Sequence, residues 1–160
     1  MDIRLKLTLD ADIETVWDAL ARPAQMQAAA SPLIRVRSRE EGGFPPKWIP
    51  NTPHLVELSL FGLIPLGTQI VEPHFEIRPH GERLVIDSGA PVSGPMTLLT
   101  QWEHRMTISV INDTQTLYLD RLRIRGGWVT IPLGIGLRFM WQLRGRSLVR
   151  TMRRISRELR

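Results

Sequence analysis

The chain has 160 residues, of which 42% are hydrophobic and 23% are charged, and its formal net charge is +5. These values fit a single globular domain over residues 1–160, large enough to bury about 70% of its unfolded surface, and they exclude a disordered chain. Because the chain has no cysteine, disulfides, thiolate metal sites and a cysteine nucleophile are excluded.

The positive charge is concentrated at the carboxyl end of the chain. From Leu133 onward, eight arginines and one glutamate give +7, which leaves −2 for residues 1–132. Such an asymmetry is compatible with contact to an anionic membrane, to phosphates or to nucleic acid. The alternative is a solvated helix face in an arginine-rich chain, since arginine outnumbers lysine by 19 to 2 overall.

The sequence shows neither a signal peptide nor a membrane-spanning segment. Residues 1–6 alternate between apolar and polar and lack an apolar core. The uncharged runs over 58–71 and 88–102 are shorter than the ~18 residues that a spanning helix needs. We therefore expect a cytoplasmic protein.

The first part of the chain predicts a strand followed by two short helices. Apolar and polar residues alternate over 3–9, the period of a strand with one buried face. Residues 10–12 offer N-cap carboxylates to a first helix, and a second helix is expected over 24–30. A second strand follows, in which Ile34 and Val36 point inward and the alternating arginines point outward.

A proline-rich segment over 42–53 cannot form regular structure, because it contains four prolines. It also contains Phe44, Trp48 and Ile49, for which a purely solvated loop has little use. Two interpretations stay open: a lid over an opening, or a structural loop fixed to the body of the domain.

Further strands are expected over 54–61 and 68–78, joined by a connection over 62–67 that contains glycine and proline. In the latter strand, Phe75 and Ile77 point to the same side as each other. A short strand and a weakly charged loop follow, over 84–87 and 88–95.

A long hairpin is predicted next, with arms over 97–111 and 116–125. Alternation places Trp102 and His104 on one face of the first arm. A loop of three residues, Asn112-Asp113-Thr114, keeps this face on the same side as the matching row of the second arm, whereas a two-residue turn would separate the rows. The matching row contains Tyr118, Asp120, Leu122 and Ile124.

The last segment, over 132–160, predicts one long helix. At about 100° per residue, its apolar residues form one stripe and most arginines lie on the far side. Arg144 falls inside the stripe, and a buried arginine needs an anion or a carboxylate partner, for which Asp120 is one candidate. The stripe consists of Leu137, Trp141, Leu148, Met152, Ile155 and Leu159.

This order of elements, with Asp10-Ala11-Asp12 leading into Val16-Trp17-Asp18-Ala19-Leu20, resembles the START/Bet v 1-like (SRPBCC) helix-grip superfamily. The strand Tyr118-Leu119-Asp120-Arg121-Leu122 and the glycine corner before the closing helix resemble its bacterial polyketide cyclase/dehydrase-like branch. The resemblance implies an α+β fold, in which a curved antiparallel sheet of about six to seven strands wraps around the long C-terminal helix, with two short helices after the first strand. It also implies a hydrophobic cavity between sheet and helix.

The candidate ligand-binding residues are those expected to face this interior. A mostly apolar pocket with a few convergent polar groups is typical of sites for a hydrophobic or amphipathic small molecule or a lipid, bound for transport or sensing. The alternative is purely structural, with Arg144 paired to Asp120 and His104 hydrogen-bonded to Tyr118. The candidates are Phe75, Trp102, His104, Tyr118, Asp120, Leu122, Trp141, Arg144 and Leu148, with Phe44, Trp48 and Ile49 on the lid loop.

Two further functions stay open. The resemblance implies an enzyme of the polyketide cyclase/dehydratase type, in which His104 would transfer a proton and Tyr118 or Arg144 would stabilise an oxyanion. Alternatively, the apolar loop tips at Phe44 and Trp48 and over 63–66, together with the helix segment 133–143, form a peripheral membrane surface or a dimer surface beside the arginines, in a monomer or a homodimer.

Neither a metal nor another cofactor is expected, because the histidines lack metal-ligand spacing. Nucleic acid is not expected as a partner, because a nucleic-acid-binding fold and interleaved aromatic residues are missing. The histidines concerned are His54, His74, His80 and His104.

Overall fold

The computed structural model describes residues 1–158, and Leu159 of the predicted helix stripe lies outside them. Within this range the chain forms eight strands, three α-helices and two short 3-10 helices. In chain order they are β1 (Asp2–Leu9), α1 (Ile13–Leu20), α2 (Pro23–Ala30), β2 (Ile34–Ser38), β3 (His54–Leu60), β4 (Ile64–Val71), β5 (Pro73–Ile77), β6 (Arg83–Asp87), η1 (Pro95–Leu98), β7 (Gln101–Asn112), β8 (Gln115–Arg125), η2 (Gly127–Val129) and α3 (Thr130–Glu158).

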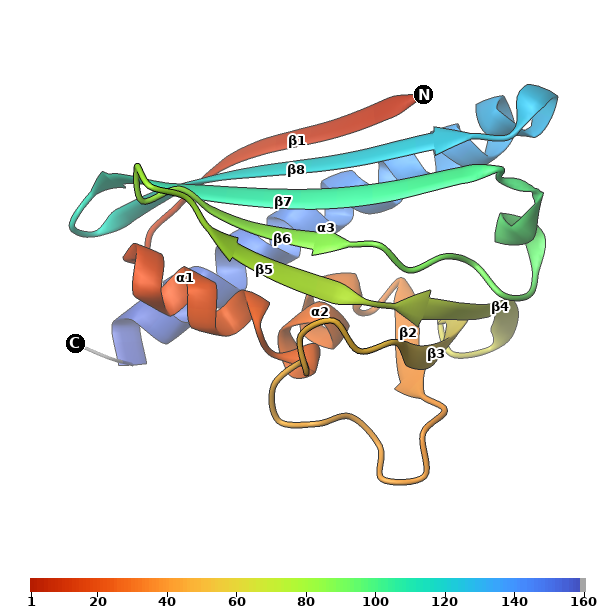
Figure 1. Cartoon of the computed structure of the whole chain (residues 1–160), viewed down its shortest axis with the longest axis horizontal. Helices are drawn as coiled ribbons and strands as arrows, with labels where there is room; N and C mark the ends of the chain where they lie inside the picture. The colour runs from red at the N-terminus through yellow and green to blue at the C-terminus, as the bar shows by residue number, and fades with distance from the viewer. Residues whose placement is uncertain (159–160) are drawn as a thin grey trace.

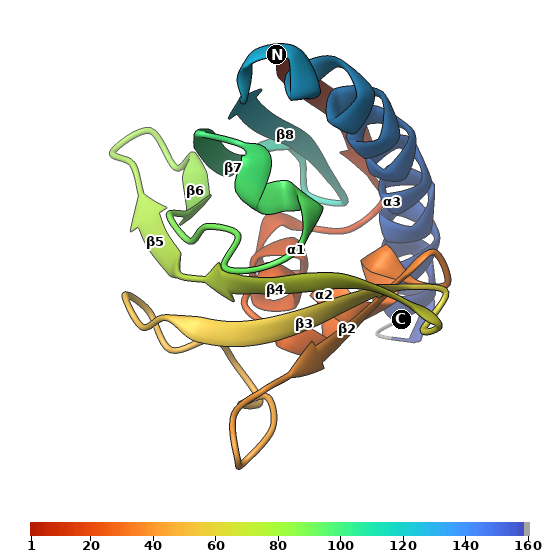
Figure 2. The same cartoon turned by 90° about the vertical axis from the view of Figure 1, so that its right-hand side faces the viewer.

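The strands divide into two antiparallel sheets. The larger sheet has the order β1-β8-β7-β6-β5, and the smaller has the order β2-β3-β4. The long helix α3 runs along the larger sheet (Figure 1), and seen from the end the two sheets, α2 and α3 surround one interior (Figure 2). This is the predicted α+β helix-grip architecture, although its strands number eight and form two sheets, where the sequence predicts about six to seven in one.

The division occurs between β4 and β5, which the sequence predicts as a single strand over 68–78. Glu72 separates the two strands, and β4 already begins at Ile64, inside the predicted connection. The turn before β4 is tight because Phe61 and Gly62 both adopt positive φ angles, which shortens the connection. Ile77 was expected to point inward with Phe75, but it lies exposed at the end of β5.

The hairpin of β7 and β8 keeps both inward rows on one face, as predicted, but by a different turn. The strands are joined by two residues, Asp113 and Thr114, and a bulge between Val110 and Asn112 supplies the extra residue. The bulge shifts the pairing of the two strands by one residue, so that both inward rows lie on one face, as a three-residue loop would also have placed them. Met106 therefore lies opposite Asp120 across the two strands.

Helix α3 packs its apolar stripe onto the larger sheet. Leu137, Trp141, Leu148 and Met152 are buried, and Ile155 packs at the edge of the core. Helix α3 approaches β1 closely at Gly145, where an added Cβ would lie 2.7 Å from the Cδ2 atom of Leu5. Within residues 1–158, no helix is long and apolar enough to cross a membrane.

The short helices follow the local sequence signals. Asp12 caps α1, since its carboxylate accepts hydrogen bonds from the backbone N–H of Thr15 at 3.0 Å and from the hydroxyl of Thr15 at 2.7 Å. Helix α2 begins with Pro23 in its first turn, where a missing N–H costs nothing. It contacts α3, and the side chain of Ser147 donates to the carbonyl of Ala28.

Candidate functional site

A cavity of about 170 Å³ lies inside the fold, between α3, α2 and the two sheets. An engineered apolar protein cavity of about 150 Å³ binds benzene, so the volume suffices for at least one small ring. The cavity is enclosed by residues from both sheets and from all three α-helices, which brings together segments far apart in the sequence.

Most of the cavity wall is apolar. Helix α2 contributes small or flexible side chains, which leave room, and the smaller sheet contributes inward-facing valines and leucines. The apolar lining residues include Val16, Ala19, Leu20, Met26, Ala29, Ala30, Ile34, Val36, Val56, Leu58, Leu66, Val71, Val85, Met96, Met140 and Leu148.

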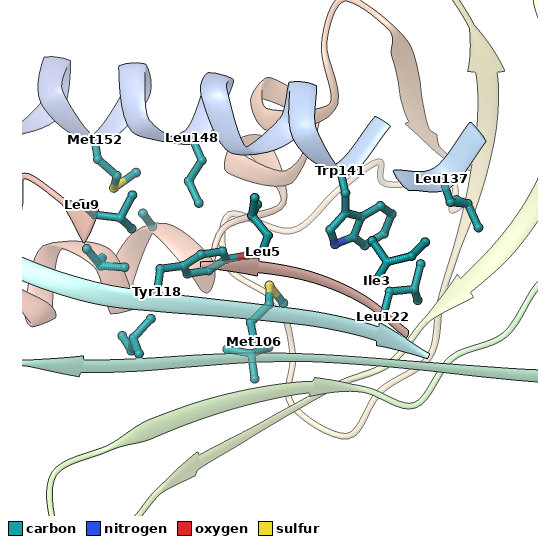
Figure 3. Close-up of a cluster of buried hydrophobic side chains, with 14 of the residues drawn as sticks. Ile3, Leu5, Leu9, Met106, Tyr118, Leu122, Leu137, Trp141, Leu148 and Met152 are labelled. Carbon is teal, nitrogen blue, oxygen red and sulfur yellow. The ribbon is translucent and has the colours of Figure 1, made fainter. Parts of the chain in front are cut away.

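A hydrogen-bonded cluster centred on Asp120 lies against one wall of the cavity. The Oδ1 atom of Asp120 accepts from His104 Nε2 at 2.8 Å and from Trp141 Nε1 at 3.0 Å, and its Oδ2 atom accepts from the Tyr118 hydroxyl at 2.7 Å. Figure 3 shows the indole of Trp141 extending from α3 toward the sheet, with Tyr118 reaching up from β8. Asp120 itself is fully buried, so its carboxylate organises the cluster from behind the cavity wall.

The environment keeps Asp120 ionised. Burial opposes ionisation, but attraction to His104 and Arg144 and the hydrogen bonds from His104 and Trp141 outweigh it, so the pKa of Asp120 lies well below its usual range. Burial and the neighbouring carboxylate raise the pKa of Tyr118 well above its usual range. Tyr118 is therefore neutral and serves as a donor to Asp120.

Arg144 extends from α3 into the cavity lining, and its side chain is only 17% exposed. Its Nη2 atom lies 3.9 Å from Asp120 Oδ2, which is an ion pair but not a hydrogen bond. Its single hydrogen bond to residues 1–158 goes to the thioether sulfur of Met106, at 3.5 Å. The guanidinium also lies over the ring of Trp141, 5.3 Å from the centroid. Several N–H groups of Arg144 thus have no acceptor in the described part of the chain.

His104 and its neighbour Asp87 add further polar atoms to the lining. His104 uses Nε2 for Asp120, and its Nδ1 atom makes no hydrogen bond to the described residues. Asp87 on β6 lies directly opposite His104 across the ladder. Its Oδ1 atom accepts the backbone N–H groups of Glu72, at 2.9 Å, and of Gly89, at 3.0 Å, whereas its Oδ2 atom has no hydrogen-bond partner among the described residues.

The cavity brings together most, but not all, of the residues that the sequence suggested. Trp102, His104, Tyr118, Trp141, Arg144 and Leu148 line it. Phe75, Asp120 and Leu122 do not: Phe75 packs edge-on against Trp17, Asp120 lies behind the lining, and Leu122 is fully buried in the core.

The loop between β2 and β3 meets the cavity through one residue. Trp48 is buried, lines the cavity, and donates its backbone N–H to the carbonyl of Ala21 at 2.8 Å. Its ring packs against Phe44 and against His54. Phe44 and Ile49 stay outside the lining, and Ile49 is 52% exposed. The structure therefore shows a loop that is fixed to the body of the domain at Trp48, with Phe44 packed against the Trp48 ring.

The sequence interpretation missed Asp87, Gln69 and Gln25, which also line the cavity. Asp87 had a usable signal, because it stands two residues after Val85 and so shares its inward face. For the two glutamines no local signal exists, since their orientation depends on how the smaller sheet and α2 pack. Within residues 1–158, no group of three or more His, Asp or Glu side chains is placed to hold a metal ion.

Comparison with known proteins defines the fold. No protein-family model matches the sequence, and no curated protein matches it. Solved structures do match: a protein from Arthrobacter aurescens has a TM-score of 0.69 at 10% identity, covering 96% of this chain and 86% of that one. Norcoclaurine synthase from Thalictrum flavum, in complex with dopamine and hydroxybenzaldehyde, has a TM-score of 0.62 at 8% identity, covering 94% and 85%.

The ZhuI aromatase/cyclase from Streptomyces sp. R1128 has a TM-score of 0.55 at 12% identity, covering 96% of this chain and 94% of that one. At such low identities these likenesses show the fold alone. They confirm the predicted helix-grip fold.

Proposed function

We propose, from a helix-grip fold with a largely apolar cavity at its centre, that the protein binds a hydrophobic or amphipathic small molecule between the sheets and α3, for transport or sensing. The observation that carries the proposal is the cavity of about 170 Å³, in which Arg144 and His104 meet apolar walls. Apolar pockets with few polar groups bind by burying ligand surface, at roughly 25 cal/mol per Å², while the polar groups orient the ligand.

A cavity-filling variant tests this proposal. Val56 on β3 is buried and lines the cavity, whereas Leu55 beside it faces outward. Val56→Phe should lower the affinity for 1-aminoanthracene, an apolar fluorescent probe, by at least about tenfold, because the ring occupies the ligand space. Leu55→Phe adds similar bulk on the outer face and should bind like the wild type. The circular dichroism spectrum of each variant checks that it is folded.

Native mass spectrometry of the purified wild type provides a second readout, since a ligand carried through purification adds a defined mass. The proposal fails if the wild type binds no probe in titration and carries no added mass. It also fails if Val56→Phe and Leu55→Phe bind the probe equally well.

A second function, catalysis of a cyclase/dehydratase type, is favoured by the geometry of His104. Asp120 holds Nε2, and Nδ1 has no hydrogen-bond partner among residues 1–158, the arrangement in which a carboxylate orients a histidine that acts as a base. Among the proteins of similar fold are an aromatase/cyclase and norcoclaurine synthase. The enzyme hypothesis predicts that His104→Ala abolishes cyclisation of a synthetic poly-β-ketone thioester while the thermal unfolding remains cooperative; turnover at the wild-type rate would remove His104 from that role.

A third function, peripheral membrane contact, is favoured by the exposed apolar side chains at the start of α3. Trp128 is 81% exposed, and Ile131, Ile135 and Phe139 are also exposed. Trp48, which the sequence interpretation included in such a surface, is buried and takes no part. This hypothesis predicts salt-sensitive co-sedimentation with phosphatidylserine vesicles that Trp128→Ala weakens, and absence of binding at low salt would contradict it.

A further inference from the structure

The charges at the polar end of the cavity indicate which polar group a bound molecule carries, an inference that rests on the proposed function. Arg144 is the sole arginine or lysine among the described lining residues. Asp120, 3.9 Å away, already balances its charge. Asp87 adds a second carboxylate, which lies in the lining itself, and its charge favours the protonated guanidinium of Arg144. The cavity therefore holds more negative than positive fixed charge unless His104 is protonated.

A carboxylate on the ligand would be opposed in either state of His104. With a neutral His104, the fixed groups carry one net negative charge, and an anionic ligand raises this to two. With a protonated His104, the fixed charges cancel, and the anionic ligand again leaves one uncompensated charge. In a largely apolar cavity such an excess is costly, because the low local dielectric strengthens repulsion and burial removes solvation.

Arg144 and Asp87 both have hydrogen-bonding capacity left over, and they require opposite groups on a bound molecule. Arg144 makes one hydrogen bond, to the Met106 sulfur, among the described residues, so its remaining N–H groups can donate to an oxygen acceptor on the ligand. Asp87 lines the cavity, and its Oδ2 atom accepts no hydrogen bond from residues 1–158, so it can accept from an O–H or N–H donor on the ligand. An uncharged ligand group that carries both a hydrogen-bond acceptor and a hydrogen-bond donor can bind Arg144 and Asp87 at the same time.

We propose that the cavity selects molecules whose polar end is uncharged and carries both an acceptor and a donor, and that Asp87 is the specificity-determining residue that rejects carboxylates. Arg144 alone would attract an anion. Because the carboxylates of Asp120 and Asp87 offset its positive charge, Arg144 instead acts as a hydrogen-bond donor to a neutral oxygen.

The test uses two probes of the same shape, 2-naphthamide and 2-naphthoate, which differ in charge and in the donor N–H groups. Isothermal titration of the wild type at pH 7.5 should give an affinity for the amide at least about tenfold higher than for the carboxylate. Asp87→Asn keeps an oxygen for the two backbone N–H groups and removes the charge. It should reduce the preference for the amide at least about threefold, mainly by strengthening carboxylate binding.

A matched control and a second variant make the test independent of one substitution. Glu103→Gln removes one negative charge from the outer face of β7, next to His104 in sequence, and should leave the preference unchanged. Arg144→Met removes the arginine cation and should increase the preference for the amide, because the carboxylate then faces Asp120 and Asp87 without the guanidinium that offsets part of their charge. This prediction holds even if Asp87→Asn does not fold.

The results separate the inference from the function on which it rests. Binding of the carboxylate as tightly as the amide by the wild type, or an unchanged preference in Asp87→Asn, overturns the inference while the binding function stands. If the wild type binds neither of these probes nor 1-aminoanthracene, the proposed function fails and the inference fails with it.

Discussion

Replacing Asp120 should cost more stability than replacing any exposed carboxylate of this protein. The carboxylate is fully buried and accepts hydrogen bonds from His104, Trp141 and Tyr118. In Asp120→Ala these donors and the Arg144 guanidinium lose their partner inside the protein, and removal of one member of a buried charged pair typically costs about 3–5 kcal/mol. For a chain of this size we expect a fall in melting temperature of about 10 °C.

Asp120→Asn should be milder, because the side-chain oxygen can still accept from His104 and Trp141. The amide nitrogen then faces the Tyr118 hydroxyl, which rotates to accept, so the main loss is the charge. We expect a reduction in the free energy of unfolding of about 1–3 kcal/mol, measured by urea titration followed by far-ultraviolet circular dichroism. Cooperative two-state curves for both variants are required for this comparison.

The pH dependence gives an independent readout of the same carboxylate. Because the pKa of Asp120 is lower in the folded than in the unfolded protein, its ionised form contributes stability above pH ~4, and the contribution is lost as the pH falls through the folded-state pKa. Asparagine does not titrate, so Asp120→Asn should lose less stability than the wild type between pH 4 and pH 2.5.

Asp2 supplies the control, since arginines also lower its pKa but its ion pairs are open to solvent. Asp2→Asn should change stability much less than Asp120→Asn, because exposed ion pairs are screened. Equal effects of the two substitutions, or acid sensitivity unchanged in Asp120→Asn, would refute the view that burial makes the Asp120 cluster structurally important.

Two other structural features give predictions that the same urea titration can check. Gly145→Ala should reduce the free energy of unfolding by about 1–2 kcal/mol, because the new methyl group forces buried Leu5 to move and this outweighs the gain in helix propensity. Gly136→Ala, where no atom lies within 4 Å of the added Cβ, should instead stabilise by up to ~1 kcal/mol, and equal signs for the two variants would contradict the packing argument. Asp12→Ala removes both bonds to Thr15 and should cost about 1 kcal/mol, and an unchanged midpoint would show that the cap contributes nothing.

The parts of the fold that local chemistry determines could be predicted from the sequence. The alternation in β1, the Asp12 cap of α1 and the apolar stripe of α3 each reflect the period or the end of a single element. The inward faces of the long hairpin were also predictable, because the alternation of side chains along each strand limits which rows can share a face. Only the turn between the strands was predicted wrongly.

Features set by packing between distant segments could not be predicted. Residues 68–78 were predicted as one strand, and only the pairing of β4 with β3 and of β5 with β6 shows that they belong to two strands in different sheets. The position of Asp87 opposite His104 depends on the register between β6 and β7, which a long loop separates. Trp48 is likewise placed by its bond to Ala21, a contact that no periodicity indicates.

The division into two sheets has a consequence for how the protein holds together. Each sheet has its own buried apolar cluster, one built on β1, β7, β8 and α3, the other on β2, β3, β4 and Trp48. Phe75 and Met140 are the side chains that pack against both clusters among residues 1–158, and the cavity takes up much of the remaining boundary. A bound molecule would fill the cavity between the two clusters and pack against both of them, as a buried side chain does. The two halves of the domain would then unfold as one cooperative unit, and hydrogen exchange in the smaller sheet would slow to the rate of the larger one.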